Sequence, residues 1–164
     1  MGKVFTFPNP VNEVSARMVA GGVVLATLVI LVLGQTWLIA PLAYGFVARV
    51  LSGPTLSPLG QVVTRVLTPA LPIEAELVPG PPKRFAQAIG AALSVSAAIA
   101  HFAFGATTLA LVLVAFITAA ATLESVLGFC LGCKAFALLM KAGVIPDDVC
   151  EACNDLRLRR PTAA

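Results

Sequence analysis

FAQAIGAALSVSAAIAHFAFGATTLALVLVAFITAAATL, residues 85–123, decides the fold of this chain because it holds no Asp, Glu, Lys or Arg. As a single helix it would be about 58 Å long at ~1.5 Å per residue, about twice the thickness of the hydrocarbon core of a bilayer. The stretch must therefore fold back on itself, and Gly105 near its middle suits the turn. We predict two membrane-spanning helices, residues 85–104 and 106–127, that form a tight hairpin.

The composition of the whole chain also indicates a membrane protein. Its 164 residues are 59% hydrophobic and 12% charged, with a mean hydropathy of +0.95. A soluble domain is typically about 25% charged, so this chain has too little polar surface to coat a globule. The net charge of +3 is small and scattered, which argues against a nucleic-acid partner. We predict an all-α integral membrane protein with a single membrane domain, residues 1–164, in contact with the lipid bilayer.

A third span is predicted over residues 18–44. No Asp, Glu, Lys, Arg or His occurs between Met18 and Ala48, and about 20 apolar residues are enough for one helical crossing. This run is too long for a signal peptide, whose apolar region has roughly 7–15 residues. The chain is therefore expected to cross the membrane three times.

The linker between the first and second spans, residues 48–84, is too rich in proline to form one continuous helix. Within it, Ser57-Pro58 opens a short run with apolar side chains on one helix face. These are Leu59, Val62, Val63, Val66 and Leu67. Two interpretations fit: an amphipathic helix that lies in the membrane interface, or an ordinary helix packed on the spans.

Small side chains recur every four residues on the second span, at Ala86, Gly90, Ser94 and Ala98. Such a stripe lets a neighbouring helix approach closely, which is how helices associate in lipid. We expect the third span to pack against it.

The segment from Ser125 to Met140 is largely apolar but is interrupted by Lys134. It is shorter than a typical span, so we expect it to be interfacial or packed against protein, with a fourth crossing as the alternative. Three crossings put nine Lys and Arg residues on one side and only Lys3 and Arg17 on the other. Positively charged residues favour the cytoplasm, so this count predicts an outer N-terminus and cytoplasmic cysteines in a bacterial cell membrane.

Four cysteines occur as two C-x-x-C pairs, Cys130 with Cys133 and Cys150 with Cys153. Their spacing lies within the range of four-cysteine zinc sites. We expect a helix over residues 125–142, a turn after it, and a second helix from Pro146, so that residues 125–158 form a helical hairpin. Antiparallel packing of its arms would bring the four sulfurs together.

Three interpretations of the cysteines remain open. The four thiolates could bind zinc or another soft metal. Cys130 and Cys133 could instead be catalytic, exchanging disulfides or carrying a persulfide sulfur. Inert packing is the third interpretation. Glu124 is a possible proton acceptor for a thiol or a partner of Lys134, whereas His101 is expected near the opposite membrane face.

Two runs, PKRFAQAIG at residues 82–90 and GFCLGC at residues 128–133, resemble a family of small bacterial integral membrane proteins known only as a domain of unknown function. The resemblance extends from the first span to Cys133. Some members of that family occur beside or fused to thioredoxin-like or rhodanese-like proteins, which implies a partner of that kind. No activity is established for the family.

We therefore expect thiol redox chemistry or sulfur handling with a soluble partner. The alternative is a non-catalytic accessory subunit of a larger membrane complex, with a structural zinc ion held by the cysteines. A transporter is less favoured, because His101 is the one ionisable residue well inside a span.

Overall fold

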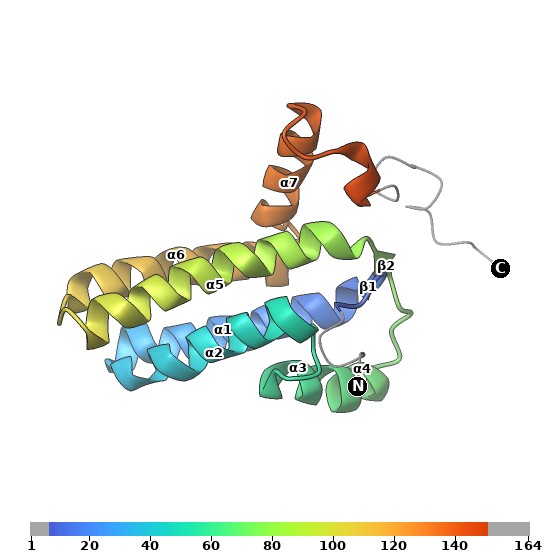
Figure 1. Ribbon diagram of the computed structural model, residues 1–164. Helices are drawn as coiled ribbons and strands as arrows, with labels where there is room; N and C mark the ends of the chain where they lie inside the picture. Colours follow the sequence, from blue (N-terminus) through green and yellow to red (C-terminus); the bar gives the residue numbers. More distant parts are fainter. Residues whose placement is uncertain (1–6, 151–164) are drawn as a thin grey trace.

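Four antiparallel helices form the body of the computed structural model, which describes residues 7–150 apart from the side chains of Asp147 and Cys150. These helices are α1 (Glu13–Leu33), α2 (Ile39–Ser52), α5 (Gly80–Phe102) and α6 (Thr107–Leu127). Successive helices run in opposite directions along one bundle (Figure 1). Three of them, α1, α5 and α6, are long and apolar enough to cross a membrane. The predicted all-α membrane architecture is thereby confirmed.

The first predicted span, residues 18–44, is divided between two helices. Gly34 ends α1 in the left-handed conformation, with φ 66°, which glycine adopts without a steric penalty. The short helix η1 (Thr36–Leu38) then turns the chain, and α2 returns along the bundle. The prediction of one helix was wrong, because the uncharged run from Met18 to Ala48 contains most of α1 and also the greater part of α2.

The hairpin of α5 and α6 turns where it was predicted. Gly105 has φ 65°, and the Nδ1 atom of His101 lies 3.1 Å from the hydroxyl oxygen of Thr107, a hydrogen bond that closes the turn. His101 therefore belongs to the end of the bundle that is opposite the cysteines.

The small-residue stripe of α5 faces protein, but its main partner is α2 rather than the third span. A Cβ atom added at Gly90 would lie 2.3 Å from the Cε1 atom of Phe46 on α2. Ser94 is fully buried, and Ala86 faces a helix that follows the bundle. The expectation was wrong about the partner because the chain has a returning helix that was not predicted.

The linker forms a bent helix at one end of the bundle, built from α3 (Pro58–Val62), the π-helical turn η2 (Val63–Leu67) and α4 (Thr68–Ala70). Ser57 caps it, since its Oγ atom accepts a hydrogen bond from the backbone N–H of Gly60. Val63 is buried against the bundle, whereas Val62 and Val66 are exposed. The helix thus packs on the bundle and still presents apolar side chains outward, as an interfacial helix would.

A two-stranded antiparallel ribbon joins the segment before α1 to the segment before α5. Its strands are β1 (Val11–Asn12) and β2 (Leu77–Val78). The side chain of Asn12 also caps α1, because its Oδ1 atom accepts a hydrogen bond from the backbone N–H of Val14.

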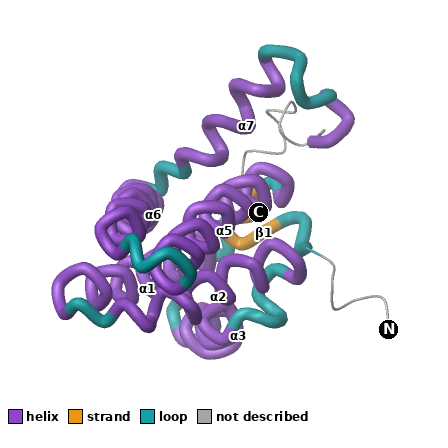
Figure 2. The backbone as a smooth tube through the Cα atoms, turned by 60° about the vertical axis from the view of Figure 1, so that its left-hand side comes forward, coloured by secondary structure: helices purple, strands orange, loops and turns teal. Residues whose placement is uncertain are grey.

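Helix α7 (Leu131–Lys141) leaves the bundle at a steep angle and is followed by the short helix η3 (Asp147–Cys150) (Figures 1 and 2). At 11 residues, α7 is about 16 Å long, too short to cross a bilayer. It packs on α5 and projects from the side of the bundle, across the bundle axis, which is the direction expected of an interfacial segment. A continuous helix over residues 125–142 was a wrong prediction, because Gly128 ends α6 in the left-handed conformation.

Every Lys and Arg of the described residues belongs to the same end of the bundle. Because α2 returns along the bundle, the linker and α7 both lie at the end where α1 begins. Arg17 was expected on the opposite side of the membrane from Lys134. That expectation was wrong, because the return of α2 puts both residues at the same end of the bundle. The other end carries Trp37, His101 and Phe104 and no charged side chain among the described residues.

Candidate functional site

Cys130 occupies the N-terminal cap of α7. Gly128 ends α6, and the chain then turns so that Cys130 takes an extended conformation, with φ −87° and ψ 106°. Its Sγ atom accepts a hydrogen bond from the backbone N–H of Cys133 at 3.3 Å. Helix N-termini attract negative charge, so the backbone places this sulfur where a thiolate is stabilised.

The two thiols of the pair are chemically different. A hydrogen bond from the Cys133 side chain lowers the pKa of Cys130, although burial acts in the opposite direction. The same hydrogen bond keeps the proton on Cys133 and raises its pKa. Cys130 is buried and Cys133 is half-buried, and both are free thiols. The geometry therefore suits Cys130 as the attacking thiolate and Cys133 as the thiol that resolves.

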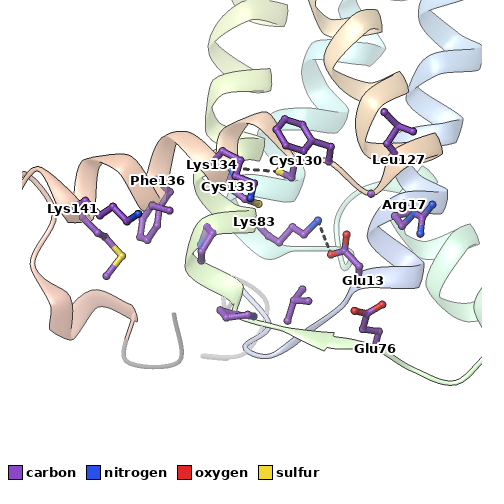
Figure 3. A pocket seen from close by; sticks show the side chains of 17 residues that line it. Glu13, Arg17, Glu76, Lys83, Leu127, Cys130, Cys133, Lys134, Phe136 and Lys141 are labelled. Atoms are coloured by element: carbon purple, nitrogen blue, oxygen red, sulfur yellow. Dashed lines mark hydrogen bonds and ion pairs between the residues drawn. The ribbon is translucent and has the colours of Figure 1, made fainter. Parts of the chain in front are cut away.

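Both cysteines line a cavity of about 800 Å³ between α7 and the charged end of the bundle (Figure 3), which we call the polar cavity because several charged side chains line it. The charged side chains in its wall are Glu13, Arg17, Glu76, Lys83, Lys134 and Lys141. The cavity belongs to the end of the molecule away from the α5–α6 turn, so a soluble molecule could reach it from water.

A buried ion triad forms the floor of this region. The Nζ atom of Lys83 lies 2.7 Å from Glu13 Oε2 and 2.8 Å from Glu124 Oε1. The three side chains come from α5, α1 and α6, so the triad joins three helices of the bundle. The suggested pairing of Glu124 with Lys134 is not what the structure contains; Lys134 lies over the ring of Phe129 at 5.6 Å.

Arg17 fixes the end of α6 just before the cysteines. Its Nη2 atom donates to the carbonyl oxygens of Ser125 and Val126 at 3.2 and 3.0 Å, and its Nε atom donates to Ser125 at 3.3 Å. A guanidinium group at these C-terminal carbonyls satisfies backbone acceptors that the helix leaves open. Sequence reasoning missed Glu13, Arg17 and Lys83 as parts of the site, because their partners lie on other helices far along the chain.

Close packing docks α7 onto α5. A Cβ atom added at Gly132 would lie 2.5 Å from the Cα atom of Ala86. One turn further on, the rings of Phe85 and Phe136 meet edge to face at 5.6 Å. The position of the C-x-x-C pair is thus set by packing on both sides of Cys133.

The second cysteine pair falls largely outside the described residues. Cys150 is described only by its backbone, which ends η3, and Cys153 lies beyond residue 150. Among the described side chains, no three His, Cys, Asp or Glu residues gather in a way that could hold a metal ion. The zinc site, which requires Cys150 and Cys153 together with Cys130 and Cys133, therefore stays a prediction.

Comparison with known proteins identifies one family. Residues 11–141 match the family described as Domain of unknown function (DUF4395). The match covers all four bundle helices and α7. No curated protein and no solved structure matches the chain.

Proposed function

We propose that this chain, which belongs to the DUF4395 family, exchanges disulfides or persulfide sulfur with a soluble partner through Cys130 and Cys133. The observation that carries the proposal is the Cys130 sulfur at the start of α7, hydrogen-bonded by the Cys133 N–H and lining an open polar cavity. In the exchange, the Cys130 thiolate attacks a sulfur of the partner's disulfide and releases one partner thiolate. Cys133 then attacks the Cys130 sulfur, which forms the internal disulfide and releases the reduced partner.

The charges around the cavity favour an acidic partner surface. The wall holds four cations, Arg17, Lys83, Lys134 and Lys141, against two carboxylates, Glu13 and Glu76. It stays net positive when Glu124, the second partner of Lys83, is included. Complementary charge speeds encounter and fixes the orientation of a docked protein. A thioredoxin-like or rhodanese-like protein with acidic residues around its reactive cysteine would fit this wall.

The distribution of charge favours a cytoplasmic position for the site. The described Lys and Arg residues are gathered at the cysteine end of the bundle, and such residues favour the cytoplasmic side of a membrane. Thiols in the cytoplasm are normally kept reduced, which suits a pair that cycles rather than a permanent disulfide.

A labelling experiment tests this orientation. A membrane-impermeant maleimide applied to intact cells should leave Cys130 and Cys133 unlabelled, and should label them after the cells are opened. Phe104 is 78% exposed at the opposite end of the bundle, so Phe104→Cys should be labelled before lysis. Labelling of Cys130 in intact cells would contradict this orientation and would show that the cysteine end of the bundle faces outward.

A trapping experiment tests the function. The Cys133→Ser variant should accumulate a mixed disulfide with a thioredoxin-like protein whose second cysteine is replaced by Ser and whose first cysteine is activated as a disulfide with an aromatic thiol. The Cys130 thiolate attacks the partner's sulfur and the aromatic thiolate leaves, and no second thiol remains to resolve the mixed disulfide. The Cys130→Ser variant is the matched control and should trap little adduct. Adducts would be identified by non-reducing electrophoresis and peptide mass spectrometry.

The metal alternative predicts a different outcome. Stoichiometric zinc in the purified protein, lost together with stability in either Cys133→Ser or Cys153→Ser and without adducts from any variant, would contradict the redox function. That result would instead support an accessory subunit with a structural zinc site.

A further inference from the structure

A second cavity of about 550 Å³ extends into the membrane-spanning part of the bundle from the cysteine end. It lies among α1, α5, α6 and α7, and from Leu113 to Glu124 it follows α6 for about 16 Å at ~1.5 Å per residue. Its wall is apolar along most of this length. The larger apolar side chains that line this part of the cavity include Val23, Phe46, Leu93, Leu113, Phe116 and Ile117.

This cavity can be reached from the lipid. Ile89 on α5 and Phe116 on α6 both line it, and both are also exposed on the outer surface of the bundle, by 38% and 62%. The space between these helices therefore opens sideways, at a depth where a soluble molecule would have to enter hydrocarbon. A ligand of this cavity must be lipid-soluble.

Polar side chains are confined to the cysteine end of the cavity, where Gln87, Glu124 and Cys130 line it. The Oε1 atom of Gln87 accepts a hydrogen bond from Arg49 Nε at 2.9 Å, which fixes the orientation of the amide. Within residues 7–150 its NH2 group has no protein acceptor, so it remains available to donate to a ligand oxygen. Cys130 is the one residue of the described chain that lines both this cavity and the polar one.

We propose that the apolar cavity binds a lipid-soluble quinone, and that the quinone accepts electrons from the Cys130–Cys133 pair. The inference rests on the proposed thiol exchange and adds its second substrate. An acyl chain would suit the apolar wall but would make no use of a donor and a thiol at its end. A quinone uses both, because its ring carbonyl accepts a hydrogen bond from Gln87 while its ring lies against Cys130.

The reaction balances without a further reagent. The Cys130 thiolate adds to the quinone ring and forms a carbon–sulfur bond. Cys133 then attacks the Cys130 sulfur, the carbon–sulfur bond breaks, and its electron pair stays on the ring. The two thiols lose two electrons and two protons in total, and the quinone gains both to become a quinol. The thiol exchange proposed above is reversible, and here it runs in the opposite direction. A soluble partner dithiol at the polar cavity reduces the new Cys130–Cys133 disulfide and itself becomes a disulfide, so that electrons pass from the partner to the membrane.

The test compares two oxidants of the reduced, full-length protein in detergent. A decyl-substituted benzoquinone should be converted to its quinol while a Cys130–Cys133 disulfide forms, which peptide mapping detects. A water-soluble aromatic disulfide should oxidise the same pair through the polar cavity. If the soluble disulfide reacts and the quinone does not, the quinone proposal is wrong while the thiol exchange stands. If neither oxidises the pair, both are wrong.

A matched pair of variants on α6 locates the quinone. Ala120 lines the apolar cavity, whereas its neighbour Ala119 is exposed and does not. Ala120→Phe should slow quinone reduction by about tenfold or more and leave the reaction with the soluble disulfide unchanged. Ala119→Phe should change neither rate. Should Ala120→Phe lose both reactions through misfolding, the smaller Ala120→Ile takes its place. Quinone reduction at the wild-type rate in the folded Ala120 variant would overturn the proposed site.

Discussion

Replacing Lys83 by Met should lower the free energy of unfolding by about 3–5 kcal/mol, since it leaves two carboxylates without their cation. The side chains of Glu13 and Glu124 are only 12% and 14% exposed, so water cannot replace the lost ion pairs. The ends of three helices at the site would also separate, because the triad joins α1, α5 and α6. Thermal unfolding in detergent, followed by helical circular dichroism, measures the loss.

The matched control for this variant is Glu13→Gln. It removes one of two negative charges and leaves Lys83 paired with Glu124 at 2.8 Å, so the loss should be well below that of Lys83→Met. Equal losses for the two variants would contradict the role of Lys83 as the shared cation of the triad.

Replacing Gly90 by Leu should destabilise the bundle by about 1–3 kcal/mol or more. The added side chain would begin 2.3 Å from the ring of Phe46, so α2 and α5 would have to move apart. Helices in lipid depend on such close packing, because the hydrophobic effect does not hold them together there. The melting temperature in detergent should fall accordingly.

Ala92→Leu is the control for Gly90→Leu, because Ala92 lies on the same helix but is exposed. It should leave the melting temperature nearly unchanged. A second test of the contact is Phe46→Ala, which should partly rescue Gly90→Leu by making room for the new side chain. Equal melting temperatures for Gly90→Leu and Ala92→Leu would show that the contact is unimportant.

The long helices of the fold could be predicted from the sequence because their signal is local. The uncharged stretch from Phe85 to Leu123 is too long for one crossing, and Gly105 supplies the turn near its middle. The return of α2 could not be predicted in this way. A shorter apolar helix after Gly34 looks like the continuation of α1 until its packing against α5 is known.

The candidate site was predictable only in part. The C-x-x-C spacing pointed to Cys130 and Cys133. The helix break at Gly128 makes Cys130 the N-terminal cap of α7, but this break could not be predicted because the apolar sequence around it resembles one continuous helix. The triad around Lys83 depends on residues 13, 83 and 124, which no local pattern connects. The sharing of Cys130 between a polar and an apolar cavity depends on how α7 docks, which the spacing of small residues does not reveal.

The pH dependence of alkylation measures most directly whether Cys130 is the activated thiol of the pair. A free thiol has a pKa of about 8.5 and reacts with iodoacetamide only as the thiolate. Because the pKa of Cys130 is lowered, its alkylation rate should reach half its maximum below about pH 8.5 and be lost only as the pH falls through that lower value. Cys133 should react more slowly, and Cys133→Ala should move the Cys130 midpoint upward by removing the thiol donor. A Cys130 midpoint at or above about 8.5, or faster alkylation of Cys133, would contradict the assignment of Cys130 as the nucleophile.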